Sequence, residues 1–132
     1  MALKSSMKIL VCDETGSTNQ IIRKMLSDIG FKNVVQASDG EKAWDIIVES
    51  VAEKPVELVI SEWNLPKVSG IDLLKKVRAN TNTDKTKFLM ITNDADQQNV
   101  ITAVKTGVSN VMVKPFSGNT LMEKIGKAFG TS

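Results

Sequence analysis

Apolar and polar positions follow two different patterns that alternate along this chain. Short apolar runs rich in valine and isoleucine occupy residues 8–12, 33–36, 57–61, 88–92 and 110–113. The longer segments between them carry apolar residues at every third or fourth position, which is the spacing of an amphipathic helix. The alternation predicts strands that are each followed by a helix. We expect all of these strands to be buried on both faces, as a parallel sheet covered by helices requires.

The first helical segment shows its pattern most clearly. Ser17 or Thr18 is expected to be its N-cap, and Gly30 is expected to end it. Four further stripes of this kind are present. One follows Gly40, one follows Gly70, one ends at Gly107, and one begins at residue 121. The stripe of the first helix comprises Ile21, Ile22, Met25, Leu26 and Ile29.

The order of these elements restricts the topology. Strand-then-helix units with short connections predict a doubly wound, five-stranded parallel sheet of the α/β class, because right-handed crossovers leave few other arrangements. In such sheets the ligand site lies beyond the carboxyl ends of the strands. The polar residues at the strand ends are therefore candidate site residues: Asp13 and Glu14, Glu62 and Asn64, Thr92, and Lys114.

These residue types fit phosphoryl chemistry. Clustered carboxylates repel one another unless a cation lies among them, and hard oxygen ligands at an open position suit Mg²⁺ or Mn²⁺. If a phosphoryl group is bound beside such an ion, Lys114 can pair with one phosphoryl oxygen and the hydroxyl of Thr92 can donate to another.

Composition limits the classes of protein that this chain can represent. Its 132 residues, 42% of them hydrophobic, suffice for one domain with a core, and a net charge of +2 without a basic stripe argues against nucleic-acid binding. No segment approaches the roughly 18 apolar residues of a membrane helix, and residues 1–6 lack the apolar core of a secretory signal. The single cysteine, Cys12, lies in an apolar run and is expected to be buried and reduced. We expect a cytoplasmic protein without a membrane partner.

The segments around the strand ends resemble those of a known family. Residues 9–14, 59–70, 90–92 and 113–116 read ILVCDE, VISEWNLPKVSG, MIT and VKPF. In order and spacing they resemble the receiver domains of two-component response regulators, in particular the CheY-like receivers of chemotaxis. The resemblance implies the (βα)5 flavodoxin-like receiver fold for residues 7–130, after an N-terminal extension of residues 1–6.

The resemblance also implies a metal site. Asp13 and Glu14 resemble the acidic pair that holds Mg²⁺ in receivers, although Mn²⁺ also suits such ligands. Asn64 matches the residue whose backbone carbonyl completes this site. Glu62 stands at the phosphoacceptor position, where its carboxylate also belongs to the metal site. No organic cofactor is implied.

The resemblance also assigns roles to two residues that contact the phosphoryl group in receivers. Thr92 resembles the switch hydroxyl that moves toward it, and Lys114 resembles the invariant lysine that contacts it. The peptide bond before Pro115 is expected to be cis, as it is in the family.

Two positions depart from the family pattern. Val111 stands where CheY-like proteins carry an aromatic switch residue, and Glu62 stands where receivers carry the phosphorylated aspartate. The extra methylene of glutamate moves its carboxylate by about 1.5 Å. We expect slow or absent phosphorylation, because a misplacement of about 1 Å can cost on the order of 10²-fold in rate. Glu62 either imitates the phosphorylated state in part, belongs to a non-phosphorylatable pseudo-receiver that serves for docking, or is an engineered change.

The resemblance implies signalling through a surface rather than enzymatic catalysis. The expected partners are a histidine kinase or phosphotransfer domain and a protein target such as a flagellar motor switch component. We expect a monomer. The output surface in relatives is built from the fourth helix, the fifth strand and the fifth helix, which here include Lys105, Thr106, Val111, Lys124 and Lys127.

A flavodoxin-like electron carrier that binds FMN is the alternative from another class. The hydroxyl-rich loop at residues 15–19 is similar to the phosphate loop of flavodoxins. However, the chain has no tyrosine and only 5% aromatic residues to stack on a flavin. The acids and the lysine at the strand ends have no role in flavin binding.

Overall fold

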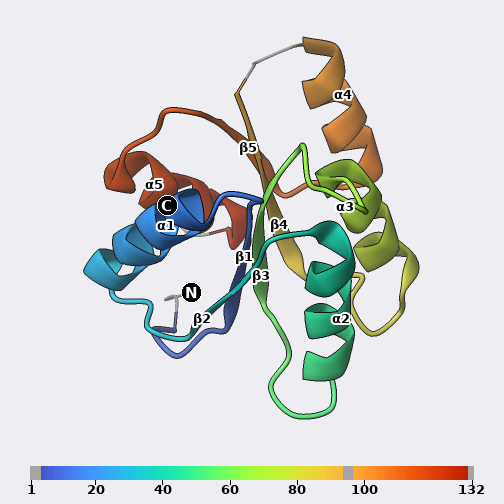
Figure 1. Cartoon of the computed structure of the whole chain (residues 1–132), viewed down its shortest axis with the longest axis horizontal. Coiled ribbons are helices and arrows are strands. Elements are labelled where there is room, and N and C mark those ends of the chain that lie inside the picture. The colour runs from blue at the N-terminus through green and yellow to red at the C-terminus, as the bar shows by residue number, and fades with distance from the viewer. Residues whose placement is uncertain (1–3, 94–96, 131–132) are drawn as a thin grey trace.

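A computed structural model describes residues 4–93 and 97–130 of the chain (Figure 1). Strands and helices alternate along the described residues, as the sequence predicts. The strands are β1 (Ile9–Cys12), β2 (Val34–Ala37), β3 (Leu58–Glu62), β4 (Lys87–Thr92) and β5 (Asn110–Val113). The helices are α1 (Gly16–Ile29), α2 (Gly40–Ser50), α3 (Gly70–Ala79), α4 (Gln97–Thr106) and α5 (Gly118–Ala128).

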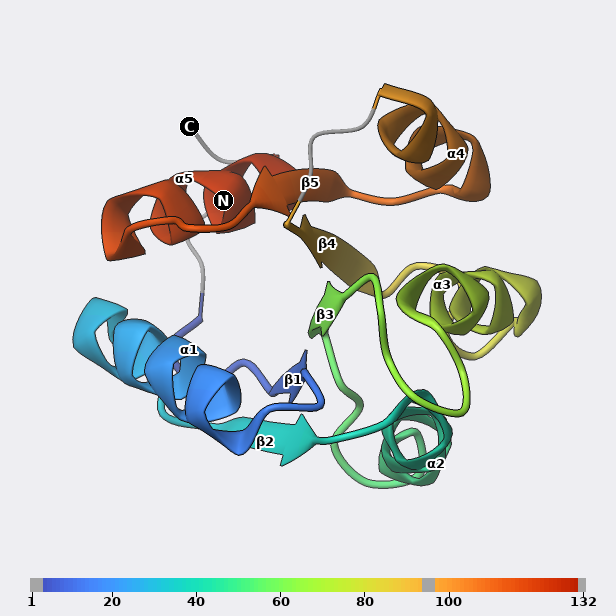
Figure 2. The same ribbon diagram turned by 45° about the horizontal axis from the view of Figure 1, so that its top comes forward.

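The strands form one parallel sheet in the order β2-β1-β3-β4-β5. Helices α1 and α5 cover one face of the sheet, and α2, α3 and α4 cover the other (Figures 1 and 2). The predicted doubly wound sheet is therefore confirmed. The direction of strand addition reverses between β1 and β3, which is where a ligand site is expected in this architecture.

Alternate residues of each central strand supply opposite halves of the core. In β1, Ile9 and Val11 pack with residues of α1 and α5, whereas Leu10 and Cys12 pack with residues of α2 and α3. Cys12 is buried as predicted. Burial raises the pKa of its thiol, and the charge of Asp13 adds to this effect. The thiol therefore remains protonated.

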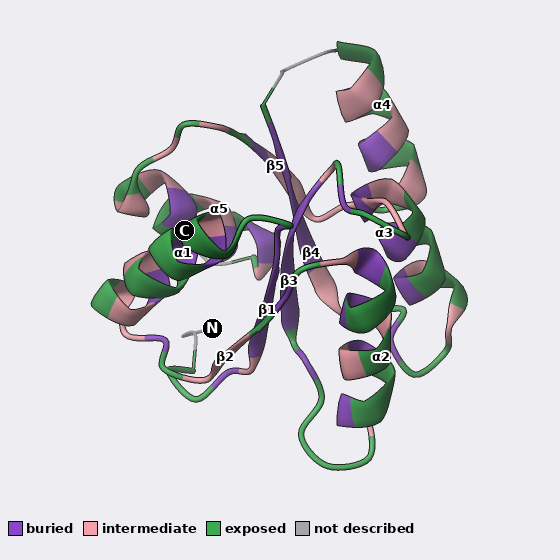
Figure 3. Cartoon of the chain, in the orientation of Figure 1, coloured by how far each residue is buried: buried purple, intermediate pink, exposed green. Residues whose placement is uncertain are grey.

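The strands differ in how deeply they are buried (Figure 3). All residues of β1 and β3 are buried, but Ala37 is the one buried residue of β2 and Met112 the one buried residue of β5. The expectation that all strands are buried on both faces is wrong for β2 and β5. These two strands form the edges of the sheet, where helices cover less of their surface.

The ends of α1 test two predictions about capping. Gly30 ends the helix as predicted: it has a φ of 117°, and its N–H donates to the carbonyls of Leu26 and Ser27. The start was misplaced, because the N-cap is Thr15 rather than Ser17 or Thr18. Thr15 makes no capping hydrogen bond with its side chain, so the local sequence carries no strong signal for this start.

The N-terminal extension lies partly outside the described residues. Residues 1–3 are not described, and the N–H of Met7 donates to the carbonyl of Lys4 at 3.1 Å. The boundary at residue 7 stays a prediction. Among the described helices, none is both long and apolar enough to cross a membrane.

The start of α2 packs directly against the loop that joins β3 to α3. The N–H of Gly40 donates to the carbonyl of Pro66 at 3.1 Å. A Cβ atom on Gly40 would overlap the backbone carbonyl of Val68. Only glycine permits this close approach, which holds the loop that follows β3 in place.

Substitution of Gly40 by alanine tests this contact. We expect the free energy of unfolding to fall by about 2 kcal/mol or more, because the added methyl group must displace backbone rather than a flexible side chain. Urea unfolding measures the change. The matched control is Gly16→Ala at the first residue of α1, where a Cβ meets no atom within 4 Å. A loss of stability of the same size in the control would contradict the steric explanation.

Candidate functional site

The register of the sheet brings strand ends from distant parts of the sequence together. Cys12 of β1 pairs with Ser61 of β3, so the next residues, Asp13 and Glu62, lie side by side. Neighbouring strands are about 4.8 Å apart, so two carboxylates meet at the carboxyl edge of the sheet. Both residues are buried, with 4% of Asp13 and 5% of Glu62 exposed.

Backbone contacts fix the orientation of Asp13. Its Oδ1 accepts a hydrogen bond from the N–H of Thr15 at 2.8 Å. Its own N–H donates to the carbonyl of Ala37 on β2 at 3.2 Å. The second carboxylate oxygen, Oδ2, is left to face the site and lies 3.1 Å from Nζ of Lys114.

Glu62 is held by its backbone but has little support at its carboxylate. Oε2 lies 2.7 Å from Nζ of Lys114, which is a close ion pair. Neither carboxylate oxygen is aligned with a donor as a hydrogen bond requires, and Oε1 has no hydrogen-bond partner among the described residues. A buried, unpartnered carboxylate oxygen is costly unless a ligand or cation completes its coordination.

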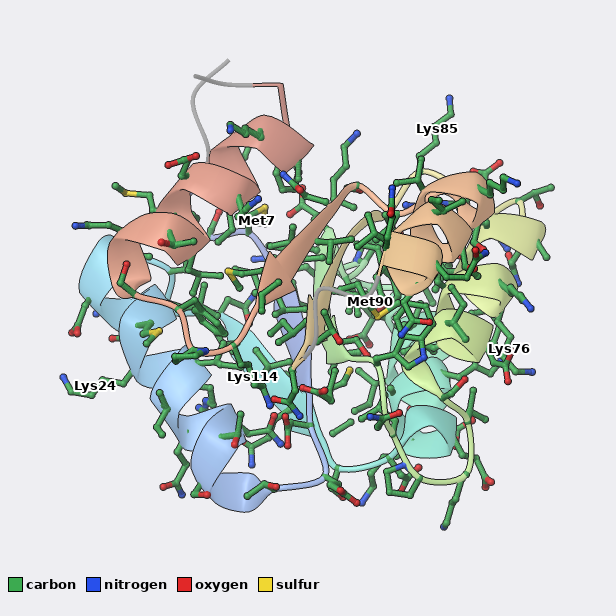
Figure 4. All side chains as sticks on the ribbon, turned by 90° about the horizontal axis from the view of Figure 1, so that it is seen from above. Met7, Lys24, Lys76, Lys85, Met90 and Lys114 are labelled. Carbon is green, nitrogen blue, oxygen red and sulfur yellow. The ribbon has the colours of Figure 1, made fainter. Side chains whose placement is uncertain are left out.

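Lys114 supplies the positive charge that these two acids share. It directly follows β5, and its backbone N–H donates to the carbonyl of Thr92 on β4 at 2.9 Å. In Figure 4 the side chain of Lys114 lies over the middle of the molecule, whereas those of Lys24, Lys76 and Lys85 extend outward. Since β4 separates β5 from β3, Lys114 must extend past the end of β4 to reach both acids.

The environment of Lys114 favours its charged form. Burial is the largest single influence and acts to lower the pKa of the ammonium. The contacts with Glu62 and Asp13, together with their negative charges, outweigh burial, so the pKa is raised above its ordinary value of 10.5. Two carboxylates and one ammonium leave about one negative charge at the site.

Thr92 ends β4 as expected and is buried, with 6% of its surface exposed. It pairs in register with Val113, the residue before Lys114. The structure thus places Thr92, Glu62 and Lys114 at neighbouring strand ends. Its role as a switch hydroxyl stays a prediction.

The other two predicted metal ligands lie at the surface, and the role of the Asn64 carbonyl stays a prediction. Glu14 and Asn64 are both exposed. Within residues 4–93 and 97–130, no group of three or more acids, histidines or cysteines is arranged to hold a metal ion. The chemistry of the site nevertheless fits a divalent cation. Asp13 and Glu62 together carry more negative charge than Lys114 neutralises, and Oε1 of Glu62 has no hydrogen-bond partner among the described residues.

Two residues that support the site escaped prediction. Asn19 on α1 is 1% exposed, and its Nδ2 donates to the carbonyl of Asp13 at 2.9 Å. Its position three residues before the buried Ile22 is a usable signal, because it places a polar side chain on the apolar stripe. Gly70 begins α3 where a Cβ would overlap the carbonyl of Glu62. No pattern of the sequence reveals that close approach.

Two further expectations concern the segment around β5. The bond between Lys114 and Pro115 is cis, as predicted. Val111 is half-buried and packs against the core cluster that α2 and α3 cover, and its match to the aromatic switch position stays a prediction.

A comparison with protein families decides the family of the chain. The family described as the response regulator receiver domain matches residues 9–126. The chain belongs to the response-regulator receiver family. This places it in two-component signalling and leaves the flavodoxin-like alternative without support.

Relatives of this receiver include chemotaxis proteins. Chemotaxis protein CheY1 of Helicobacter pylori strain J99 is 38% identical over 126 residues, which are 96% of this chain and 99% of the relative. The structure of CheY4 of Vibrio cholerae matches with a TM-score of 0.81 and 26% identity, over 93% of this chain and 98% of that chain. The protein is thus a CheY-like receiver related to chemotaxis proteins.

A more distant structure carries the same fold. It is the receiver domain of a sensor histidine kinase from Pseudomonas aeruginosa PAO1, and it matches with a TM-score of 0.81 and 21% identity over 96% of this chain and 99% of that chain. That domain is described with a magnesium ion coordinated in its active site cleft.

Replacement of Lys114 by methionine tests the shared ammonium of this receiver. Methionine keeps a long unbranched side chain but leaves Asp13 and Glu62 buried without a counter-charge. We expect urea unfolding at pH 7 to show a loss of about 3 kcal/mol. The control is Lys24→Met, because Lys24 pairs with Asp28 at 3.4 Å on the exposed surface of α1. Exposed pairs contribute little, so the control should change stability by less than about 1 kcal/mol.

The raised pKa of Lys114 predicts a specific pH dependence. A group whose pKa is raised on folding contributes its full stabilisation below its unfolded pKa and loses it as the pH rises through its folded pKa. The difference in unfolding free energy between the receiver and Lys114→Met should therefore be constant between pH 7 and about 10, and it should shrink above the ordinary value of 10.5. A difference that stays constant well above that value would contradict the assignment.

Proposed function

We propose that this chain is a single-domain CheY-like response regulator that acts in the cytoplasm as a monomer and signals through a protein-interaction surface. In this proposal Glu62 occupies the phosphoacceptor position, and the receiver does not accept a phosphoryl group in the usual way. The observation that carries the proposal is the ion pair of Glu62 with Lys114 at 2.7 Å, which sets a carboxylate against the lysine that is expected to contact a phosphoryl group.

Geometry argues against phosphoryl transfer to Glu62. The backbone at this position is fixed on both sides, because the N–H of Trp63 donates to the carbonyl of Ile91 at 2.9 Å and Gly70 abuts the carbonyl of Glu62. The longer side chain therefore cannot be offset by a shift of the strand. In-line transfer depends on the position of the attacking oxygen, so a displacement of about 1.5 Å lowers the rate strongly.

The receiver's acids are suited to a divalent cation. Asp13, Glu14 and Glu62, with the backbone carbonyl of Asn64, would hold Mg²⁺ or Mn²⁺. When bound, such an ion neutralises carboxylate charge and polarises a phosphoryl oxygen. Asp13 contributes a carboxylate that is oriented by Thr15, and Lys114 holds positive charge beside it.

Glu62 imitates the phosphorylated state only in part. Phosphorylation brings a charge of about −1.5 to −2 and three acceptor oxygens, whereas a carboxylate has one charge and two oxygens. The contact with Lys114 supplies one of the expected interactions. Val111 has no ring that can move between exposed and buried positions, so this part of the switch is missing.

A pseudo-receiver that serves for docking is the second candidate. The observation that favours it is the ammonium of Lys114, which already bridges Asp13 and Glu62 without any ligand. In a docking module this arrangement is structural, and neither metal nor phosphodonor changes the surface. The two candidates therefore differ in their response to metal.

The proposed partners are a histidine kinase or phosphotransfer domain and a protein target such as a flagellar motor switch component. The proposed output surface consists of α4, β5 and α5. Lys105 and Lys127 are exposed on it, and Lys124 is half-buried. Beside them, α4 exposes Val104 by 62% and Ile101 by 38%, which supports a surface that contacts another protein.

Glu62→Asp tests the role of the phosphoacceptor position. With Mg²⁺ and a small acyl phosphate, we expect the aspartate variant to incorporate phosphoryl groups at least about 100-fold faster than the chain that carries Glu62. Fluorescence of Trp63, the next residue, should respond to Mg²⁺ in both proteins but to the phosphodonor only in the variant. Glu62→Gln is the control for loss of charge. Stoichiometric, acid-stable and base-labile phosphorylation of Glu62 would contradict the proposal, and no metal response in either protein would favour the docking module.

The double variant Lys105→Ala/Lys124→Ala tests the output surface. We expect its affinity for a flagellar switch protein to fall about tenfold, because two positive charges leave the surface that contacts the partner. Lys24→Ala/Lys76→Ala is the charge-matched control, since Lys24 lies on α1 and Lys76 on α3, and both side chains extend outward away from α4, β5 and α5 (Figure 4). Equal affinities for the two double variants, measured by titration calorimetry, would count against this surface.

A further inference from the structure

Helix α4 is held by less buried surface than any other helix in the described chain. Ala103 is its one buried residue, whereas α1, α2, α3 and α5 each bury three or four residues. Figure 3 shows α4 as mostly exposed or half-buried. A helix with so few buried apolar contacts is expected to have low local stability. Its position must therefore depend on other interactions.

The carboxyl end of α4 is closed by a tight turn. The N–H of Gly107 donates to the carbonyl of Val104 at 3.1 Å, and the N–H of Val108 donates to that of Ala103 at 3.0 Å. Gly107 has a φ of 103°, which glycine adopts readily. This is a Schellman motif, and it leaves the carbonyl of Gly107 pointing away from the helix.

Arg78, near the end of α3, binds that carbonyl. Its Nε donates to the oxygen of Gly107 at 2.9 Å. Its Nη1 donates to the carbonyl of Thr86 at 2.6 Å and to that of Asp84 at 3.1 Å. One guanidinium thus joins three backbone segments: the end of α3, the loop before β4 and the turn after α4.

Arg78 is half-buried and lies close to the turn after α4. Burial lowers the pKa of the guanidinium, and the charge of Asp84 opposes this effect. Arginine nevertheless remains protonated in proteins, so all of its bonds are donated by a charged group, which strengthens them. A Cβ atom on Gly107 would lie 3.2 Å from Nε of Arg78, so the turn and the side chain fit closely.

We propose that Arg78 is a positioning residue that anchors the carboxyl end of α4. Lys105 and Thr106 form the last residues of α4, directly before the anchored turn. Given the proposed function, in which α4 belongs to the output surface, the anchor fixes this part of the surface relative to α3.

Hydrogen–deuterium exchange of the intact protein, read residue by residue by NMR, tests the anchor. In Arg78→Ala we expect amides from Ala103 to Ser109 to exchange at least about tenfold faster, beyond any uniform change in the slowest amides of β1 and β3. Arg78→Lys should give a smaller increase, because an ammonium keeps the charge but lacks the planar fork that reaches three carbonyls. Lys75→Ala on the same helix is the control, since Lys75 is exposed and pairs with the exposed Asp72 at 3.8 Å.

The outcomes separate an anchor from general stabilisation. Acceleration at the end of α4 that exceeds the acceleration in α5 supports the proposal. Equal acceleration throughout the protein, or no change at α4 in either Arg78 variant, overturns it. If Arg78→Ala does not fold, the same comparison of exchange rates at the end of α4 and in α5 is made for Arg78→Lys, and it decides whether Arg78 is an anchor. Exchange requires no partner, so a negative result bears on the anchor alone, whereas failure of the double lysine variant bears on the output surface.

Discussion

Two buried carboxylates lie side by side because β1 and β3 are adjacent parallel strands in fixed register. Asp13 and Glu62 follow paired residues of these strands, so neither can move away from the other without breaking the ladder. Their repulsion requires positive charge, and Lys114 supplies it from the end of β5, at the edge of the sheet. The rest of the site is arranged around this requirement: Asn19 and Thr15 hold Asp13, and the start of α3 abuts the backbone of Glu62.

Much of the fold follows from local patterns in the sequence. The buried strand β1 is a continuous apolar run, β3 begins with one, and Gly30 ends α1 where its stripe ends. The partial exposure of β2 and β5 was not predictable from their composition, because edge position depends on the order of strands in space. The start of α1 was misplaced because Thr15 caps it with backbone geometry and no side-chain bond.

The meeting of four predicted residues at the strand ends followed from their positions in the sequence, whereas the supporting roles of Asn19 and Gly70 did not. Residues at strand ends converge in any parallel sheet, so Asp13, Glu62, Thr92 and Lys114 could be placed together without coordinates. Local patterns do not reveal which of these groups touch. The ion pair of Lys114 with Asp13 joins residues that are 101 positions apart in the sequence, and side-chain direction decides whether they meet.

The buried thiol of Cys12 lies directly before Asp13 on β1. Its raised pKa and complete burial keep it unreactive while the sheet is intact. Alkylating reagents therefore have access to it only in molecules in which the end of β1 has opened. The rate of Cys12 modification therefore measures how often the end of β1, beside Asp13, separates from α2 and α3.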